Sequence, residues 1–263
     1  MRLMVTGAAG GIGRAVAVLA AGRYGDCSVA LVDRDEDGME QVAGELAAVD
    51  ARVVTITADL TTVDGPADAV AAAERELGGL DVLVSNAGIG ASSALKDLPV
   101  EDWDRVFAVN TRATWLLAKA AYGSLAESRG SIVATTSISA RFPTPPMGPY
   151  SPAKAALLML VKQLALEWGP VGIRANCVAP GPTDTPLTFR SFGDPEDAAA
   201  ADNRAYRESQ IPLRRIGTPE DVARAVLFLA GPDAAHVTGT EITVDGGLTL
   251  ALMPATGTGR TPR

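Results

Sequence analysis

The stretch LMVTGAAGGIG, residues 3–13, places a short apolar run directly before a loop rich in glycine. The apolar run reads as a buried strand, and the residues after Gly13 read as a helix that continues to about Tyr24. Glycine lets the backbone approach a pyrophosphate, and a helix N-terminus offers free N–H groups and positive potential to the same anion. The spacing G-x-x-x-G-x-G departs from the common G-x-G-x-x-G, and any tight turn between strand and helix uses glycine. The loop therefore needs support from other motifs.

Further apolar runs along the chain are continuous and are separated by helical patterns. Such strands are typical of a parallel sheet that helices cover on both faces. Strands are predicted over residues 3–5, 28–33, 52–58, 81–85, 131–136, 173–179 and 241–244. Helices are predicted over residues 35–49, 66–77, 100–125, 150–168 and 219–230, and residues 186–210 are expected to be irregular. We predict an α/β, Rossmann-like doubly wound fold with a seven-stranded, mostly parallel sheet and helices on both faces.

The composition is that of a globular protein, with 47% hydrophobic and 21% charged residues among 263. A formal net charge of -8 and the lack of a Lys/Arg cluster argue against a nucleic-acid or membrane partner. The sequence shows no signal peptide and no apolar run of spanning length, so we expect a cytoplasmic protein. Residues 1–253 show no composition break and are predicted to form one domain. Residues 254–263 are rich in Pro, Gly and Thr and are expected to be a disordered tail.

The chain offers little material for a metal site. Cys27 and Cys177 each lie in an apolar, strand-like run, which favours reduced core thiols over a disulfide or metal site. His236 is the only histidine. We therefore expect no metal and no catalysis based on histidine.

Tyr150 and Lys154 are four residues apart, so on a helix they lie on one face, one turn apart. A phenol with its ordinary pKa of about 10 is a poor proton shuttle at neutral pH. A nearby ammonium lowers that pKa because it favours the phenolate. Proline is tolerated only in a first helical turn, so Pro152 indicates a helix that starts near Tyr150. The pair is thus a candidate general acid or base at the start of a helix, with a chance surface pair as the alternative.

Asp33 ends the second predicted strand, twenty residues after Gly13. An acid there can accept hydrogen bonds from the ribose hydroxyls of an adenosine. It could also cap the next helix, and one residue could serve both roles. A 2′-phosphate would meet its negative charge, and residues 8–10 carry no basic side chain to offset it. Arg34 could swing toward such a phosphate, but we rank Asp33 above it and predict NAD as the cofactor.

Several short motifs occur along the chain, namely Thr6-Gly-x-x-x-Gly-Ile-Gly13, Asp59-Leu60, Asn86-Ala-Gly88, Asn110, Ser137 with Tyr150-x-x-x-Lys154, Pro180-Gly181 with Thr185, and Asp245-Gly-Gly247. Together these motifs resemble the short-chain dehydrogenase/reductase family. They follow the family's order and spacing between residue 3 and about residue 250, which argues against coincidence.

The resemblance implies a catalytic set of Asn110, Ser137, Tyr150 and Lys154. Ser137 would bind the substrate oxygen, and Asn110 would bend its helix and hold a water for proton relay. Lys154 would hold the nicotinamide ribose hydroxyls and lower the pKa of Tyr150. Asp59 would meet the adenine, and Thr183 and Thr185 would reach the carboxamide. The implied cofactor contacts are Gly7, Gly11, Ile12, Gly13, Asp33, Asp59, Leu60, Asn86, Ala87, Gly88, Tyr150, Lys154, Pro180, Gly181, Thr183 and Thr185.

A mostly apolar substrate pocket is predicted after the strand ends and in the segment beyond Pro180. Its candidates are Ser137, Phe142, Met147, Tyr150, Pro182, Phe189 and Phe192, with Ile89 and Arg141 beside them. Loop packing is the alternative for Phe189 and Phe192. Arg141 could pair with a substrate anion or hydrogen-bond backbone.

These residues predict an NAD(H)-dependent oxidoreductase that interconverts a secondary alcohol and its ketone. Hydride passes between the carbinol carbon and nicotinamide C4, and Tyr150 exchanges the hydroxyl proton. The alternative is a 3-oxoacyl-thioester (acyl-carrier-protein) reductase, which docks an acidic carrier and usually takes NADPH. The acidic chain and Asp33 argue against it. A third hypothesis is that the protein binds a dinucleotide without catalysis. The intact Ser-Tyr-Lys set argues against it.

The resemblance also implies a homotetramer with two-fold axes. Relatives pair the helices that correspond to residues 100–125 and 150–168, and the strand region near residues 244–252. The apolar residues 248–253 lie just beyond the last strand and would be costly to leave in water. The predicted partners are therefore further copies of this chain and a small, mostly apolar substrate, with no nucleic acid and no membrane.

Overall fold

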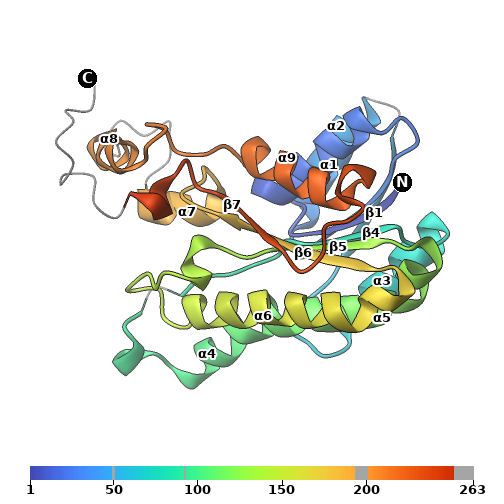
Figure 1. Ribbon diagram of the computed structural model, residues 1–263, viewed down its shortest axis with the longest axis horizontal. Helices are drawn as coiled ribbons and strands as arrows, with labels where there is room; N and C mark the ends of the chain where they lie inside the picture. Colours follow the sequence, from blue (N-terminus) through green and yellow to red (C-terminus); the bar gives the residue numbers. More distant parts are fainter. Residues whose placement is uncertain (49–50, 92, 193–200, 252–263) are drawn as a thin grey trace.

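Seven strands form one sheet in the order β3-β2-β1-β4-β5-β6-β7 (Figure 1). All neighbouring strands pair in parallel. The strands are β1 (Arg2–Thr6), β2 (Ser28–Asp33), β3 (Arg52–Thr57), β4 (Val82–Ser85), β5 (Ser131–Thr135), β6 (Arg174–Pro180) and β7 (Glu241–Val244). The computed structural model describes residues 1–48, 51–91, 93–192 and 201–251, without the side chains of residues 190–192. Within these residues, the predicted Rossmann-like, seven-stranded sheet is confirmed.

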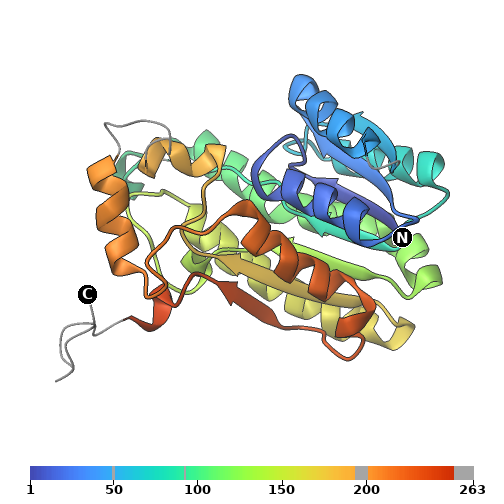
Figure 2. The same cartoon turned by 90° about the horizontal axis from the view of Figure 1, so that it is seen from above.

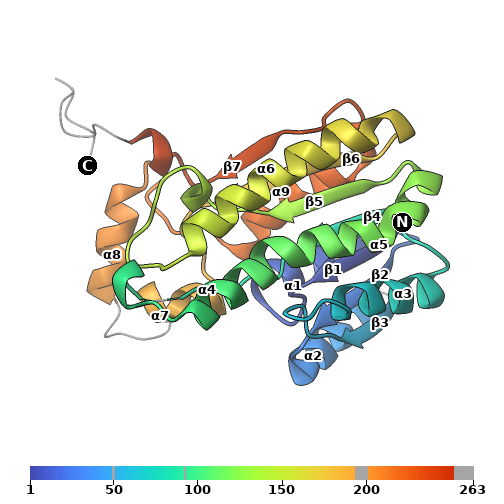
Figure 3. The same ribbon diagram turned by 90° about the horizontal axis from the view of Figure 1, so that it is seen from below.

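Helices cover both faces of the sheet. One face carries α1 (Gly11–Arg23), α2 (Glu36–Ala47) and α9 (Pro219–Ala230), as Figure 2 shows from above. The other carries α3 (Gly65–Leu77), α4 (Val100–Phe107), α5 (Ala113–Ser128) and α6 (Tyr150–Trp168), which Figure 3 shows from below. Successive strand residues enter opposite cores: Leu3 and Val5 pack in one, and Met4 packs in the other. This double burial explains why the strands read as continuous apolar runs.

The helix predicted over residues 100–125 is interrupted. A π-helical turn, Ala108–Arg112, separates α4 from α5 and contains Asn110. The Asn110 side chain donates to Ile89 O at 2.8 Å and accepts from Ile89 N at 2.9 Å. A π-turn widens the helix locally and is frequent at functional sites. The expected bend at Asn110 therefore takes the form of a change in helical hydrogen bonding.

The prediction that residues 186–210 are irregular was wrong. The segment contains α7 (Pro186–Phe192) and α8 (Ala201–Gln210), which lie beyond the end of the sheet formed by the carboxyl ends of the strands (Figures 1 and 2). None of the residues of α8 is buried, so this helix has no apolar stripe to reveal it. Its Ala, Arg, Glu and Gln content still favours helix.

Among the described residues, no helix is long and apolar enough to cross a membrane. Cys27 and Cys177 are buried free thiols, as predicted. The predicted tail, residues 254–263, lies outside the described residues, and the single domain over 1–253 stays a prediction.

Candidate active site

β1 and β4 flank the point where the strand order reverses direction. In open α/β sheets, ligands bind beside the carboxyl ends of the strands at such a point. The loop after β1 has positive φ at Gly7 (66°) and Gly11 (51°), a region that favours glycine. A Cβ at Gly13 would lie 2.0 Å from Gly7 O. The three glycines of the motif are therefore required by the backbone of this loop.

Hydrogen bonds join the carboxyl ends of β1, β4 and β5. Thr6 Oγ1 accepts from Asn86 N at 3.0 Å and from Ala87 N at 3.1 Å. The Asn86 amide donates to Thr6 O at 3.2 Å and to Gly7 O at 3.3 Å. Thr135 Oγ1 donates to Asn86 Oδ1 at 3.0 Å. The predicted cofactor residues of the first and fourth strands thus form one rigid unit.

Asp33 is fixed against the glycine loop. Its Oδ2 accepts from Ala9 N at 3.1 Å, and its Oδ1 accepts from Arg34 N at 2.8 Å. Asp33 does not take the alternative N-cap role, because α2 is capped by Asp35, which accepts from Gly38 N at 3.1 Å. The Asp33 carboxylate therefore stays at the end of β2, beside the loop.

Asp59 lies near Arg34 at the same edge of the sheet. Thr61 donates to Asp59 Oδ1 through its hydroxyl at 2.7 Å and through its amide at 2.8 Å. These bonds hold the pKa of Asp59 below its ordinary value, and the charge of Arg34 adds to the effect. The neighbouring Leu60 is buried.

The loop after β6 reaches the glycine loop from the other side. A Cβ at Gly11 would lie 3.2 Å from Thr185 Cγ2. Thr183 and Thr185 are both buried. A Cβ at Gly181 would lie 2.6 Å from Asp245 Cβ, so the Pro180-Gly181 and Asp245-Gly-Gly247 motifs pack against each other.

The four predicted catalytic residues are all buried at this edge. Tyr150 is the first residue of α6, as the position of Pro152 predicted. The Lys154 ammonium donates to Thr135 O at 2.7 Å. A Cβ at Gly88 would lie 3.2 Å from Asn110 Oδ1 and 3.4 Å from Lys154 Nζ, so these groups adjoin. The structure therefore brings the set together.

Ser137 contacts Tyr150 and begins a short 3₁₀ helix, Ile138–Ala140. Its hydroxyl lies beside the Tyr150 phenol and favours the ionised form of that phenol. Its Oγ also accepts from Ser139 N at 3.1 Å, which caps the 3₁₀ helix. The hydroxyl is thus held by its own loop while it faces the phenol.

Burial shifts the pKa values of both members of the Tyr150–Lys154 pair. Burial raises the pKa of Tyr150, and the neighbouring Ser137 hydroxyl opposes this. Burial lowers the pKa of Lys154 to about 8. The prediction that Lys154 lowers the pKa of Tyr150 is therefore not met, because the ammonium points to Thr135 O and lies 5.8 Å from the centre of the phenol ring.

The buried Lys154 makes stability depend on pH. Between about pH 8 and pH 10.5 the folded amine is neutral while the unfolded amine is protonated, so stability rises with pH in this window and is lost as pH falls. From pH 7 to 10, we expect the free energy of unfolding of the wild type to rise by about 2 kcal/mol relative to Lys154→Met. Urea denaturation of both proteins measures this. A constant difference would contradict the lowered pKa.

Apart from Ser137 and Tyr150, the predicted substrate residues lie in the loop before α6, in α7 and in the loop after β6. The backbone of Met147 contacts that of Tyr150, because Tyr150 N donates to Met147 O at 3.1 Å. Phe142 is half exposed, and Phe189 lies one turn into the helix after Thr185. Pro182 O accepts from Gly217 N at 2.9 Å. The side chain of Phe192 lies outside the described residues. The shared pocket stays a prediction.

Sequence analysis missed two residues that help to build the site. Thr135 binds both Asn86 and Lys154, although it ends an apolar strand and has no motif. Glu241 forms an ion pair with Arg141 at 2.7 Å, a contact that the sequence did not predict for either residue. Glu241 is the first residue of the edge strand β7, where a charged side chain is expected to face solvent. Only the three-dimensional arrangement identifies either residue.

A family model described as Enoyl-(Acyl carrier protein) reductase matches residues 7–249. The 2-(S)-hydroxypropyl-CoM dehydrogenase 3 of Xanthobacter autotrophicus is 38% identical over 252 residues, which cover 94% of this chain and 96% of the relative. The inactive 2-(S)-hydroxypropyl-CoM dehydrogenase 2 of the same organism is 40% identical over 223 residues, which cover 84% of this chain and 94% of that protein. The crystal structure of a short-chain type dehydrogenase/reductase from Mycobacterium marinum is 34% identical with a TM-score of 0.84, covering 94% of this chain and 95% of that one. The chain belongs to the short-chain dehydrogenase/reductase family.

Proposed function

We propose that this protein is an NAD(H)-dependent oxidoreductase that interconverts a secondary alcohol and its ketone. Family membership alone does not carry the activity, because one relative at 40% identity is named inactive. The supporting observation is that Ser137, Tyr150 and Lys154 are buried together at the carboxyl edge of the sheet, with the Ser137 hydroxyl beside the Tyr150 phenol. A hydroxyl donor beside a phenol can hold a carbinol or carbonyl oxygen between them, where the phenol exchanges its proton.

Each catalytic residue has a distinct proposed task. Ser137 binds the substrate oxygen and orients it toward the Tyr150 hydroxyl. Lys154 holds the nicotinamide ribose hydroxyls, and Asn110 holds a water through which the proton of Tyr150 is relayed. Asn110 adjoins Lys154 at Gly88, which gives such a relay a short route.

The residues around the glycine loop fit a dinucleotide. Gly10 caps α1 without a side-chain hydrogen bond, so the first N–H groups of the helix are available to a pyrophosphate. A Cβ at Gly10 would meet nothing closer than Pro186 Cγ at 3.9 Å, which leaves space in front of that turn. Asp33 would hold the adenosine ribose, and Asp59 the adenine. The bound nicotinamide supplies the hydride acceptor or donor.

A panel of secondary alcohols tests the activity. Purified protein with NAD is given 2-butanol, cyclohexanol, 1-phenylethanol or 2,3-butanediol, and reduced cofactor is followed by absorbance. We expect turnover of at least one alcohol, with the more apolar ones favoured because the predicted pocket is mostly apolar. No turnover of any alcohol, and none of the matching ketones with NADH, would contradict the proposal.

The raised pKa of Tyr150 predicts opposite pH dependences for the two directions. Burial keeps the phenol neutral at pH 7, so it can donate a proton to a ketone. Alcohol oxidation needs the phenolate, so its rate should rise about tenfold per pH unit below the apparent pKa. Rates in both directions between pH 6 and 10 provide the check. An oxidation rate that is flat over this range would contradict the assignment of Tyr150 as the base.

The alternative of a 3-oxoacyl-thioester reductase has less support. Such an enzyme docks an acidic carrier protein, and this chain carries a net charge of -8. Like charges on both partners oppose such docking. The Asp33 carboxylate, fixed beside the glycine loop, also disfavours NADPH.

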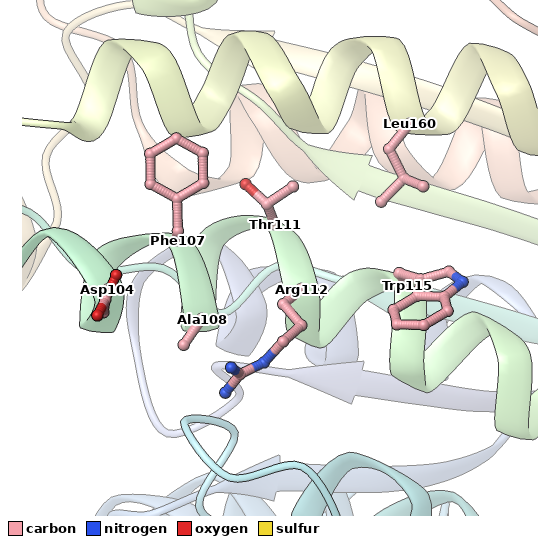
Figure 4. Close-up of a pocket in the computed structure, with 7 residues that line it drawn as sticks. All are labelled: Asp104, Phe107, Ala108, Thr111, Arg112, Trp115 and Leu160. Atoms are coloured by element: carbon pink, nitrogen blue, oxygen red, sulfur yellow. The ribbon is translucent and has the colours of Figure 1, made fainter.

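We further infer that the cytoplasmic form of the protein is a homotetramer. α5 and α6 expose large apolar side chains on the outer surface of the molecule, namely Trp115, Tyr122, Met159 and Leu166. The same surface has a cavity of about 620 Å³ between α4, α5 and α6 (Figure 4). Asp104, Phe107, Ala108, Thr111, Arg112, Trp115 and Leu160 line it. Exposed large apolar side chains beside a hollow are typical of an interface between copies.

Light scattering should give about 108 kDa, four times the 27.0 kDa chain, at micromolar concentration. Met159→Glu places a charge in the proposed interface and should reduce the mass at least twofold. Val63→Glu changes an equally exposed apolar residue elsewhere and serves as the control. A monomeric wild type, or a Met159→Glu protein of unchanged mass, would contradict this assembly.

A further inference from the structure

Glu241 carries a carboxylate that is fully buried, with 0% of its side chain exposed. Thr136 Oγ1 donates to its Oε1 at 2.6 Å. Arg141 Nε lies 2.7 Å from its Oε2. Within the described part of the chain no N–H points at Oε2, so the Arg141 contact acts as an ion pair without an aligned hydrogen bond. A carboxylate buried this deeply needs such a compensating charge.

The two partners of Glu241 flank Ser137 on both sides. Thr136 precedes Ser137 directly, and its amide donates to Val178 O at 2.8 Å. Arg141 follows the 3₁₀ helix that Ser137 caps, and its amide donates to Ile138 O at 3.0 Å. Glu241 lies on β7, separated from β5 by β6. One carboxylate from the edge of the sheet therefore holds both ends of segment 136–141.

We propose that Arg141 and Glu241 are positioning residues that hold Ser137 against Tyr150. The proposal rests on the proposed function, because it assigns the pair an effect on the hydroxyl that binds the substrate oxygen. Neither side chain touches the reacting atoms. Their ion pair holds segment 136–141 in the conformation in which Ser137 caps its 3₁₀ helix and its hydroxyl lies beside the Tyr150 phenol.

This pair differs from the surface ion pairs of the chain because one of its partners is buried. The Arg141 side chain is 50% exposed, but the carboxylate it faces is 0% exposed. Arg75 and Glu76 form a pair at 3.4 Å with exposures of 71% and 48%. Exposed ion pairs contribute little to the free energy of unfolding. In contrast, the loss of one partner leaves a buried charge unpaired and forces local rearrangement. The rearrangement would occur in the segment that carries Ser137.

The test uses the full-length protein, NAD and the panel alcohol with the highest kcat/KM. Arg141→Met alone leaves a buried carboxylate unpaired and can unfold the chain, so the main variant is the double Arg141→Met/Glu241→Gln. Arg141→Lys keeps the positive charge, and Arg75→Met is the matched control. The double variant is also made in a Ser137→Ala background. Thermal unfolding and the Kd of NADH are recorded for each protein.

We expect the folded double variant to lose roughly tenfold to a hundredfold in kcat, because small misplacements of a positioning group cost this much. The Kd of NADH should stay unchanged. Arg141→Lys should keep kcat within about threefold of the wild type, since it keeps a positive charge opposite the buried carboxylate. In the Ser137→Ala background the double change should cost less than about twofold, because groups that act through one residue are not additive.

Two results would overturn the inference. One is a folded double variant with the kcat of the wild type or of Arg75→Met. The other is the same loss of kcat with and without Ser137, which would show that the pair does not act through that hydroxyl. Full activity of Ser137→Ala, or no turnover of any panel alcohol by the wild type, contradicts the proposed function itself and removes the basis of the inference with it.

Discussion

Replacement of Tyr150 by phenylalanine is expected to lower kcat by at least about a hundredfold and to leave cofactor binding nearly unchanged. The ring would still fill its site at the start of α6, where Tyr150 is only 8% exposed. The substitution removes only the hydroxyl, which lies beside the Ser137 side chain. General acid–base catalysis by one positioned group is typically worth 10²-fold or more, which sets the expected loss.

Steady-state kinetics and NADH titration of Tyr150→Phe separate these two effects. Tyr122→Phe is the matched control, because Tyr122 is 38% exposed on α5 and takes no part in the site. The loss should appear in kcat, with little change in the Kd of NADH. If Tyr150→Phe kept more than about a tenth of the wild-type kcat, Tyr150 would not be the acid or base.

The sequence allowed the sheet and most of its helices to be predicted because the signals are local. Strands buried on both faces are continuous apolar runs, and β1 with residues Leu3, Met4 and Val5 shows why. The spacing of Tyr150 and Lys154 predicted a shared helix face, and both side chains are buried at the site. α8 was missed because it has no buried residue, so its helical character rests on propensity alone.

The parts of the site that were not predicted depend on contacts between distant residues. The spacing on α6 fixes the face that carries Lys154, but Thr135 O on β5 fixes the direction of its ammonium. Glu241 meets Arg141 across a sequence separation of a hundred residues, and neither belongs to a family motif. The same holds for pKa values: charge proximity suggested a lowered pKa for Tyr150, whereas burial raises it. Burial follows from the packing of the whole edge of the sheet.

We expect the protein to favour NAD over NADP by about a hundredfold in kcat/KM. The Asp33 carboxylate is held in place by Ala9 N and Arg34 N, so it cannot move far from a 2′-phosphate. At an effective dielectric of about 20, unit charges about 4 Å apart repel by roughly 4 kcal/mol. Solvent screening reduces this to about the 2.7 kcal/mol that a hundredfold preference represents.

Arg34 is the residue that could reverse this preference, but its charge already acts on Asp59. The guanidinium contributes to the lowered pKa of Asp59, which places it near that carboxylate. Its backbone amide donates to Asp33 at 2.8 Å. Without Asp33, Arg34 would become the nearest fixed charge to a 2′-phosphate, and the balance would move toward NADP.

Asp33→Ala should therefore lower the NAD preference to about tenfold or less, mainly through a gain in kcat/KM with NADP. The matched control is Asp35→Ala, which removes the same charge two residues along the chain. Asp35 caps α2, so its loss should cost about 1 kcal/mol of stability and leave the preference unchanged. The measurement compares kcat/KM for both cofactors in the three proteins. A wild type that prefers NADP, or an Asp33→Ala protein with the wild-type ratio, would show that Asp33 does not select the cofactor.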